Sequence, residues 1–220
     1  MKHVVVLGKG ILAVKVAQWL FESSEYQLDC VVPNFPESTN MPSLRTWAEE
    51  HGVPFVATGK TEDIPGIQDA SVVGDLAISV TYDKIIKPWF IAKYSKVVNI
   101  HNGPLPHYRG VNPINWSLKN AEKQHGVTMH EITPGIDDGP VISEVLFPVN
   151  PEVDEVIDVY ERSLHFGWKL FKETMPRLWE IVPMKQDESQ ARYYSKQDFP
   201  KLGDRSYFTR KESREKLNLL

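Results

Sequence analysis

The sequence lacks features that several classes of protein require. It has a single cysteine, Cys30, so neither a disulfide framework nor a zinc cluster can form within the chain. Cys30 lies in the apolar run 28–32, where we expect a buried thiol. No apolar run approaches the roughly 18 residues that span a membrane, and residues 4–7 already read as a strand, with no charged leader and cleavage site before them. We therefore expect a protein of the reducing cytoplasm without a membrane partner.

An excess of positive charge is also missing. The 25 lysine and arginine residues face 29 aspartate and glutamate residues, which leaves a formal net charge of −4 and a pI near 6.0. The chain as a whole therefore has no electrostatic attraction toward nucleic acid, which counts against a tRNA substrate. The sequence contains no internal repeat and no low-complexity tract.

Strand and helix patterns alternate through the first half of the chain. With 220 residues the chain can form one large or two small domains around a sizeable core. Short apolar runs are typical of strands buried on both faces, and alternation with helices predicts an α/β fold with a mostly parallel sheet and helices on both faces. The predicted strands are residues 4–7, 28–32, 54–56, 75–80 and 97–101; the predicted helices follow Gly10 and Ser43 and cover 88–92.

The second half differs in pattern. Strands at 127–130 and 141–149 lie close in sequence and predict an antiparallel or mixed extension of the sheet. Helices are predicted at 113–121 and 152–181, the latter kinked by Pro176. We predict a catalytic domain over residues 1–183 and a C-terminal extension over 184–220, whose aromatic residues pack on the core or on a second subunit.

Polar side chains end the apolar run at residues 97–101. Side chains alternate along a strand, so Asn99 and His101 share a face. Pro104 and Pro106 then end regular structure. Polar groups at the carboxyl end of a strand, followed by a stiff loop, are typical of sites in α/β folds. The alternative interpretation is a loop with ordinary hydrogen-bonding caps.

Asp137 is the strongest candidate to supply a carboxylate to the face that His101 occupies. It belongs to an acidic pair before the turn at Gly139, which alone is typical of turn chemistry. An amide, an imidazole and a carboxylate nevertheless make a usable acyl-transfer set. The amide and imidazole donate to a developing oxyanion, and the carboxylate orients the imidazole and accepts a proton.

Three motifs occur in order: Asn-x-His at 99–101, Leu-Pro-x-Tyr-Arg-Gly at 105–110, and Gly-Val-Thr-x-His at 126–130, with Asp137 seven residues further on. Together they resemble the folate-dependent formyltransferases over roughly residues 1–180. The stretch 101–116 is similar to the sugar N-formyltransferases in particular. The resemblance also extends to the catalytic domain of methionyl-tRNA formyltransferase and to glycinamide ribonucleotide formyltransferase.

The resemblance implies a Rossmann-like formyltransferase fold and catalytic roles for Asn99, His101 and Asp137. It implies formyl-tetrahydrofolate as the formyl donor, no metal, and a nucleotide-linked amino sugar as acceptor, with thymidine diphosphate as the carrier by analogy. Lipopolysaccharide O-antigen biosynthesis is the corresponding pathway. The residues that the resemblance assigns to the folate site are Thr81, Tyr82, Asp83, Ile132 and Gly135.

Two positions depart from the family pattern. Gly103 stands where many members have serine, so a contact from that hydroxyl is absent. The loop 8–12 lacks the Ser-Asn element of the ribonucleotide formyltransferases, which weakens a purine-pathway assignment.

The first glycine loop has two interpretations. Gly8-x-Gly10-x-x-Ala13 is an accepted variant of the dinucleotide-binding fingerprint, but no acidic residue follows the second strand to hold a ribose. We therefore assign Gly8, Lys9 and Gly10 to the phosphate or sugar of the substrate instead.

The histidines could be interpreted as a metal site. His101, His107 and His130 together with Asp137 supply ligand types, but their spacing matches no metal signature. We expect His130 to pack or hydrogen-bond beneath the catalytic loop, with folate binding as the alternative.

Further candidates for substrate contact follow the catalytic motif. Arg109 suits bidentate contact with a phosphate, and its alternative is a surface salt bridge. Tyr108 is assigned to the same site. Trp116 and the C-terminal aromatics have two interpretations, core or dimer packing and stacking on a nucleotide base.

The hypothesis is a cytoplasmic sugar N-formyltransferase that forms a homodimer. One rival is a tRNA formyltransferase, which carries a second, basic domain after the core; only about 40 residues follow the long helix here, too few for such a domain. Another is a non-catalytic folate- or nucleotide-binding module. The sequence identifies neither the amino sugar, nor the ring position of its amine, nor the nucleotide carrier.

Overall fold

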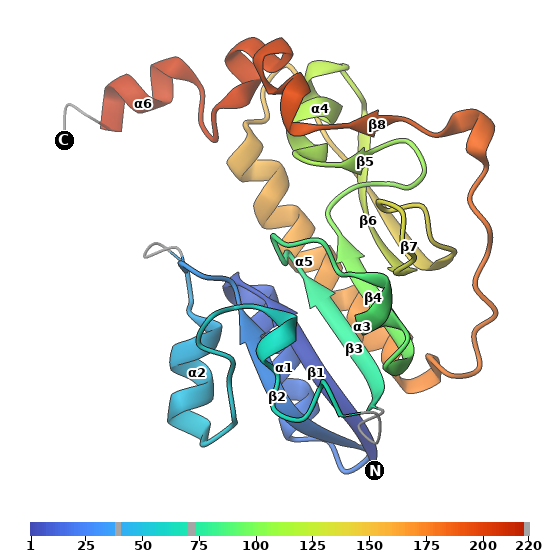
Figure 1. Ribbon diagram of the computed structural model, residues 1–220. Helices are drawn as coiled ribbons and strands as arrows, with labels where there is room; N and C mark the ends of the chain where they lie inside the picture. The colour runs from blue at the N-terminus through green and yellow to red at the C-terminus, as the bar shows by residue number, and fades with distance from the viewer. Residues whose placement is uncertain (38–40, 70–73, 218–220) are drawn as a thin grey trace. The chain divides into compact units, whose positions relative to one another are not determined.

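A computed structural model describes residues 1–37, 41–69 and 74–217. The chain divides into two compact units (Figure 1). The first unit comprises Met1–His101 and Met129–Gly135, and the second comprises Asn102–Thr128 and Ile136–Leu220. No helix among the described residues is both long and apolar enough to cross a membrane.

The first unit is built on a parallel sheet. Its strand order is β2-β1-β3-β4, followed by the Met129–Glu131 end of β6, and the pairings β1–β2, β1–β3 and β3–β4 are all parallel. The mostly parallel sheet that the sequence predicted is confirmed. The strands and helices of this unit are β1 (Lys2–Gly8), α1 (Gly10–Phe21), β2 (Tyr26–Pro33), α2 (Leu44–His51), η1 (Thr61–Asp63), β3 (Gly74–Val80), α3 (Pro88–Ile91), β4 (Tyr94–His101) and the end of β6 (Gln124–Glu131).

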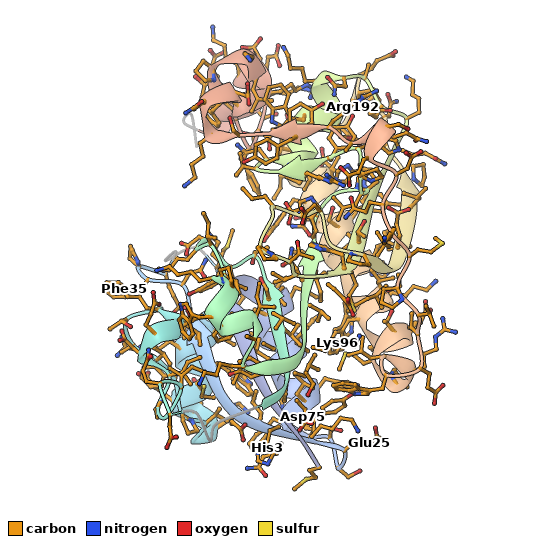
Figure 2. All side chains as sticks on the ribbon, turned by 45° about the vertical axis from the view of Figure 1, so that its right-hand side comes forward. His3, Glu25, Phe35, Asp75, Lys96 and Arg192 are labelled. Carbon is orange, nitrogen blue, oxygen red and sulfur yellow. The ribbon has the colours of Figure 1, made fainter. Side chains whose placement is uncertain are left out.

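Apolar runs place the strands of this unit in the core. Residues 4–7 of β1 are almost completely buried, and Cys30 on β2 is the buried thiol that the sequence predicted. Helix α1 packs on β1 and β2, and α2 packs on α1 and β2. Near the start of β1, the backbone N–H of His3 donates to the carboxylate of Asp75 at 2.7 Å, and Figure 2 shows the two residues side by side. Burial of these runs is the main stabilising contribution.

The second unit combines short strands and helices. The beginning of β6 is adjacent to β7, and β5 and β8 form a separate two-stranded parallel sheet. The elements of this unit are β5 (Arg109–Gly110), α4 (Pro113–Lys119), β7 (Val141–Pro148), α5 (Val156–Thr174), η2 (Met175–Arg177), η3 (Glu188–Gln190), β8 (Tyr193–Tyr194), η4 (Lys196–Ser206) and α6 (Lys211–Leu217). Because β8 belongs to the predicted C-terminal extension, that extension contributes a strand to this unit. The predicted boundary after residue 183 stays a prediction.

Two predicted elements depart most from the observed structure. The predicted helix 152–181 begins only at Val156, because Glu155 and Asp158 form a capping box there, and it ends at Thr174, before the 3-10 turn that contains Pro176. The predicted strand 54–56 is an isolated bridge between Phe55 and Val31. Side-chain capping decides where the helix begins, and a single bridge is all the pairing that the strand makes among the described residues. The spacing of apolar residues indicates neither of these features.

Candidate active site

Asn99 and His101 lie at the carboxyl end of β4, in the first unit. The amide Nδ2 of Asn99 is 3.2 Å from Nε2 of His130. The other ring nitrogen of His130, Nδ1, is 2.8 Å from the carbonyl oxygen of Glu131. A carbonyl only accepts, so Nδ1 carries the proton and Nε2 accepts from Asn99. The imidazole of His130 therefore holds the amide of Asn99 in one orientation.

His101 completes this group. Its ring centroid is 6.2 Å from that of His130, in an edge-to-face arrangement. Both histidines are buried, with 7% of His101 and 2% of His130 exposed. The sequence predicted that His130 packs or hydrogen-bonds beneath the catalytic loop. The structure shows a hydrogen bond to Asn99 on β4, and the position beneath the loop stays a prediction. The sequence did not identify Asn99 as the partner, because that contact depends on which strands are neighbours.

The first glycine loop is tied to the end of β3. The N–H of Lys9 donates to the carbonyl of Val80 at 3.2 Å, and the hydroxyl of Thr81 donates to the carbonyl of Lys9 at 2.9 Å. Asn34 joins the same group, because its side-chain amide donates to the carbonyl of Thr81 at 3.1 Å. The structure thus brings together residues assigned to the substrate and to folate. At Gly8 a Cβ would lie 1.8 Å from the carbonyl oxygen of Val80. The close approach that this glycine permits is therefore to the protein's own backbone.

The other residues assigned to folate also lie in the first unit. Tyr82 and Ile132 pack against one apolar cluster that contains Phe90. The hydroxyl of Tyr82 donates to the carbonyl of Gly59 at 2.8 Å, and burial raises the pKa of this phenol. Asp83 is exposed and pairs with Lys84 at 3.2 Å, and the N–H of Gly135 donates to Thr133 at 3.3 Å. Tyr82 and Ile132 therefore share an apolar environment, which Asp83 does not.

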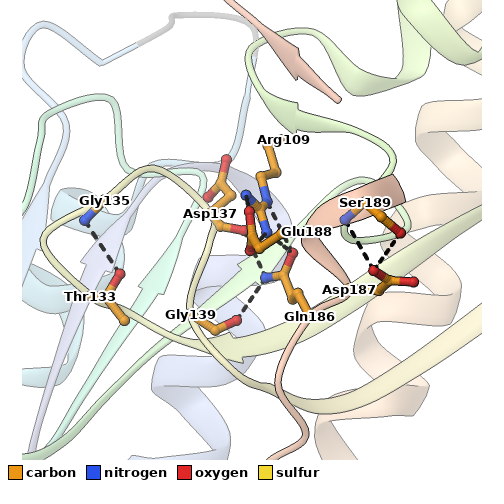
Figure 3. Close-up of polar contacts among 9 residues, drawn as sticks. All are labelled: Arg109, Thr133, Gly135, Asp137, Gly139, Gln186, Asp187, Glu188 and Ser189. Carbon is orange, nitrogen blue, oxygen red and sulfur yellow. Dashed lines mark hydrogen bonds and ion pairs between the residues drawn. The ribbon is translucent and has the colours of Figure 1, made fainter. Parts of the chain in front are cut away.

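Asp137 lies in the second unit, in a turn with a left-handed backbone (φ 51°). Its carboxylate accepts from the backbone N–H of Gly110 at 2.8 Å. Beside it, the guanidinium of Arg109 donates to Gln186 and to Glu188 (Figure 3). The bidentate pair with Glu188 raises the pKa of Arg109 and lowers that of Glu188. Only 8% of the surface of Arg109 is exposed, whereas the side chain of Glu188 is 70% exposed. The ion pair therefore reaches the surface, and the predicted contact of Arg109 with substrate stays a prediction.

Tyr108 and Trp116 belong to an aromatic cluster of the second unit. Both rings stack on Tyr194, with centroids 5.7 Å and 4.5 Å away. The hydroxyl of Tyr108 donates to Glu122 at 2.7 Å, and burial followed by this hydrogen bond raises the pKa of Tyr108. These contacts match the packing interpretation, and the predicted contacts with substrate stay predictions.

The C-terminal aromatics differ in their burial within this single chain. Tyr194 is half-buried, whereas four others stay exposed on this single chain: Tyr193, Phe199, Tyr207 and Phe208. Burial by the chain's own core therefore accounts for one of the five aromatic residues of this segment.

The group at the end of β4 has the chemistry of an oxyanion site. An amide nitrogen has two N–H donors, and His130 takes one of those of Asn99. The imidazole of His101, on the same strand, can supply another donor. Among the described residues, no three histidine, cysteine, aspartate or glutamate side chains are placed to hold a metal ion. The donor set is suited to acyl transfer.

Comparison with known proteins matches this chemistry. The family model described as formyl transferase matches residues 60–175. The methionyl-tRNA formyltransferase of Synechococcus sp. (strain JA-3-3Ab) is 30% identical over 167 residues, which are 72% of this chain and 51% of that protein. The methionyl-tRNA formyltransferase of Citrifermentans bemidjiense is 29% identical over 201 residues, which are 87% of this chain and 63% of that protein. This chain thus spans between half and two thirds of the length of these relatives.

A solved structure is also similar. The N-formyltransferase from Helicobacter canadensis, in complex with folinic acid and dTDP-3-aminofucose, superposes with a TM-score of 0.77 at 26% identity. The similarity covers 90% of this chain and 72% of that one. The Rossmann-like formyltransferase fold that the sequence resemblance implied is confirmed.

Proposed function

The chain belongs to the formyl transferase family, and we propose that it transfers a formyl group from formyl-tetrahydrofolate to the amino group of a nucleotide-linked amino sugar. The observation that carries the choice of acceptor is the likeness to the Helicobacter canadensis enzyme over 90% of this chain. That enzyme is in complex with folinic acid and dTDP-3-aminofucose. The net charge of −4 also favours a small substrate over a nucleic acid.

In the proposed reaction the neutral amine of the sugar attacks the formyl carbon. Asn99 and His101 donate to the carbonyl oxygen as it becomes an oxyanion. The tetrahedral species then collapses: the bond from the formyl carbon to the folate nitrogen breaks, and that nitrogen takes up a proton. The products are a formamide and tetrahydrofolate. Tyr82 and Ile132, which pack on the same apolar cluster, are suited to one side of a flat pterin ring.

Asp137 removes the proton that the attacking amine must lose. In the proposal its carboxylate also orients the imidazole of His101. The N–H of Gly110 holds one carboxylate oxygen at 2.8 Å. Since a protonated amine cannot attack, we expect activity to fall at acidic pH.

A second candidate is methionyl-tRNA formylation. It is favoured by the 30% sequence identity to the Synechococcus relative. This chain covers 51% of the length of that relative. Both candidates use the same donor chemistry, so only the acceptor distinguishes them. Formyl-tetrahydrofolate would be supplied with dTDP-3-aminofucose, a UDP-linked amino sugar, glycinamide ribonucleotide or methionyl-tRNA. Mass spectrometry of each product, together with tetrahydrofolate release, identifies the acceptor. Formylation of methionyl-tRNA alone would overturn the amino sugar proposal.

Substitutions test the catalytic assignment. Asn99→Ala is expected to lower turnover roughly a hundredfold, the loss typical of one oxyanion donor, and His101→Asn at least as much. Asp137→Asn is close to isosteric, and we expect it to abolish most turnover while both substrates still bind. Asp138→Asn is the matched control in the same turn. Equal losses at the two aspartates would mean either that Asp137 is the wrong carboxylate or that both are needed.

The quaternary structure and the pathway are separate proposals. The exposed C-terminal aromatics of the single chain favour a homodimer with this segment at or beside the interface. Light scattering at micromolar concentration tests this, and a mass of one 25.2 kDa chain would contradict it. A cytoplasmic location and a role in O-antigen biosynthesis stay predictions that depend on the identity of the sugar.

A further inference from the structure

Gln186 joins Arg109 to the turn that carries Asp137. Its side-chain oxygen accepts from Nε and Nη2 of Arg109, at 3.0 and 2.9 Å. Its side-chain nitrogen donates to the backbone carbonyls of Asp137 and Gly139, at 2.8 and 2.7 Å. All four bonds lie within the second unit, and Figure 3 shows the amide between the guanidinium and the turn.

The orientation of this amide is determined by chemistry. A guanidinium only donates, so it takes the oxygen of Gln186, and carbonyls only accept, so they take the nitrogen. Glu188 holds the other side of the guanidinium, with bonds of 3.0 and 2.6 Å. Arg109 is therefore immobilised from both sides, and it holds the amide of Gln186 with its two donors toward the turn.

The turn needs such support. Asp137 has a backbone φ of 51°, a conformation that residues with a Cβ rarely adopt and keep only where the surroundings hold it. Gln186 binds the carbonyls of Asp137 and Gly139, one on each side of Asp138. The N–H of Gly110, next to Arg109, binds the carboxylate itself. The backbone and the side chain of Asp137 are thus held by one connected set of groups.

We infer that Gln186 is a positioning residue, which holds the left-handed turn so that the carboxylate of Asp137 is presented in its reactive orientation. The inference rests on the proposed catalytic role of Asp137. It assigns a function in the reaction to the segment that follows the long helix α5, 49 residues away from Asp137 along the chain.

Gln186→Glu tests the inference without a change of size. The introduced carboxylate keeps an oxygen for Arg109 but places its second oxygen against the two carbonyls of the turn. We expect kcat with formyl-tetrahydrofolate and dTDP-3-aminofucose to fall about tenfold or more, as for a misplaced catalytic group. The KM for formyl-tetrahydrofolate should stay within about twofold of the wild-type value. Gln190→Glu is the matched control. It adds the same charge in the same segment, where Gln190 contacts Asp187, and kcat should stay unchanged.

A second measurement reads the position of Asp137 without any substrate. Hydrogen exchange of the Gly110 amide reports its bond to the carboxylate, and Asp137→Ala sets the exchange rate of the unbonded amide. In Gln186→Glu this amide should exchange nearly as fast as in Asp137→Ala, and in Gln190→Glu as slowly as in the wild type. If Gln186→Glu does not fold, Gln186→Met, of similar length and without hydrogen-bonding groups at the same atoms, takes its place.

The outcomes separate the two claims. A wild-type kcat in the Gln186 variant, or an unchanged Gly110 exchange rate, overturns the positioning role. Equal losses in kcat and in affinity for the donor, together with a lower unfolding temperature, would show a purely structural role and overturn it too. If the wild type formylates no amino sugar, the proposed function fails, and the exchange measurement alone then decides whether Gln186 holds Asp137.

Discussion

The amide of Asn99 donates to Nε2 of His130 at 3.2 Å, and this one hydrogen bond determines how a candidate oxyanion donor is presented. The partner is a buried imidazole on a different strand, held in turn by the carbonyl of Glu131 at 2.8 Å. Because the carbonyl requires a proton on Nδ1, the tautomer of His130 follows from the backbone. The donor direction of Asn99 thus depends on a residue that need not touch the substrate.

Substitution of His130 tests this dependence. His130→Leu removes the acceptor and leaves the amide of Asn99 free to rotate, so we expect kcat to fall roughly tenfold, less than the roughly hundredfold loss expected for Asn99→Ala. His130→Gln retains an acceptor and should lose less than His130→Leu. Steady-state kinetics with the acceptor identified above measures both. If the two variants lose the same activity, or neither loses any, the orienting role is wrong.

Gly8 is expected to tolerate no side chain. It has a backbone φ of 141°, and a Cβ would lie 1.8 Å from the carbonyl oxygen of Val80. Gly8→Ala should therefore lower the free energy of unfolding by more than about 4 kcal/mol, in the range of severe core disruption. Gly52→Ala is the control, because Gly52 also has a positive φ (65°) but nothing within 4 Å of an added Cβ. It should cost about 1 kcal/mol. Urea unfolding measures both, and equal costs would contradict the role of the close approach.

The thiol of Cys30 is expected to be inert in the folded protein. Burial, with a further contribution from the charge of Asp29, raises its pKa to about 12, and the thiolate is the reactive form. A disulfide reagent at about pH 8 should therefore label the native protein only as fast as it unfolds. The same reagent in guanidinium chloride gives the control, one labelled thiol per chain. Rapid labelling of the native protein would contradict the buried position of Cys30.

Asp154 is expected to make stability depend on pH. Burial acts to raise the pKa of its carboxyl, but the hydrogen bonds from Arg162 and from the backbone N–H of Asn150, at 2.6 Å for the latter, lower it overall. A lowered folded-state pKa stabilises the fold above the unfolded value of about 3.9, and this contribution is lost as the pH falls through the folded value.

Asp154→Asn should accordingly be less stable than the wild type at about pH 7, by about 1 kcal/mol or less because solvent screens the pair. The difference should shrink below about pH 4. Urea unfolding across this range measures it, and Asp204→Asn, at an exposed carboxylate, is the control. A difference that grows toward acidic pH would contradict the assigned direction.

Much of the first unit can be predicted from local patterns. The apolar run 4–7 lies within β1 and the run 75–80 lies within β3, because a strand buried on both faces needs no alternation. The start of α5 at Val156 was predicted four residues too early, since the side chains of Glu155 and Asp158 decide where the first turn begins. Apolar spacing reports which face of a helix is buried and says little about its ends.

The sequence by itself determined that Asn99 and His101 share a face, because the alternation of side chains along a strand is local, and it determined the chemical types available for acyl transfer. Only the tertiary structure decided their partners. Asn99 meets His130 31 residues away, and Arg109 meets Gln186 77 residues away and Glu188 79 residues away. Such partners depend on which strands become neighbours and where the chain returns. The reason is physical: periodicity and capping act over a few residues, whereas a buried polar side chain is satisfied by whichever group the packing of the whole unit brings to it.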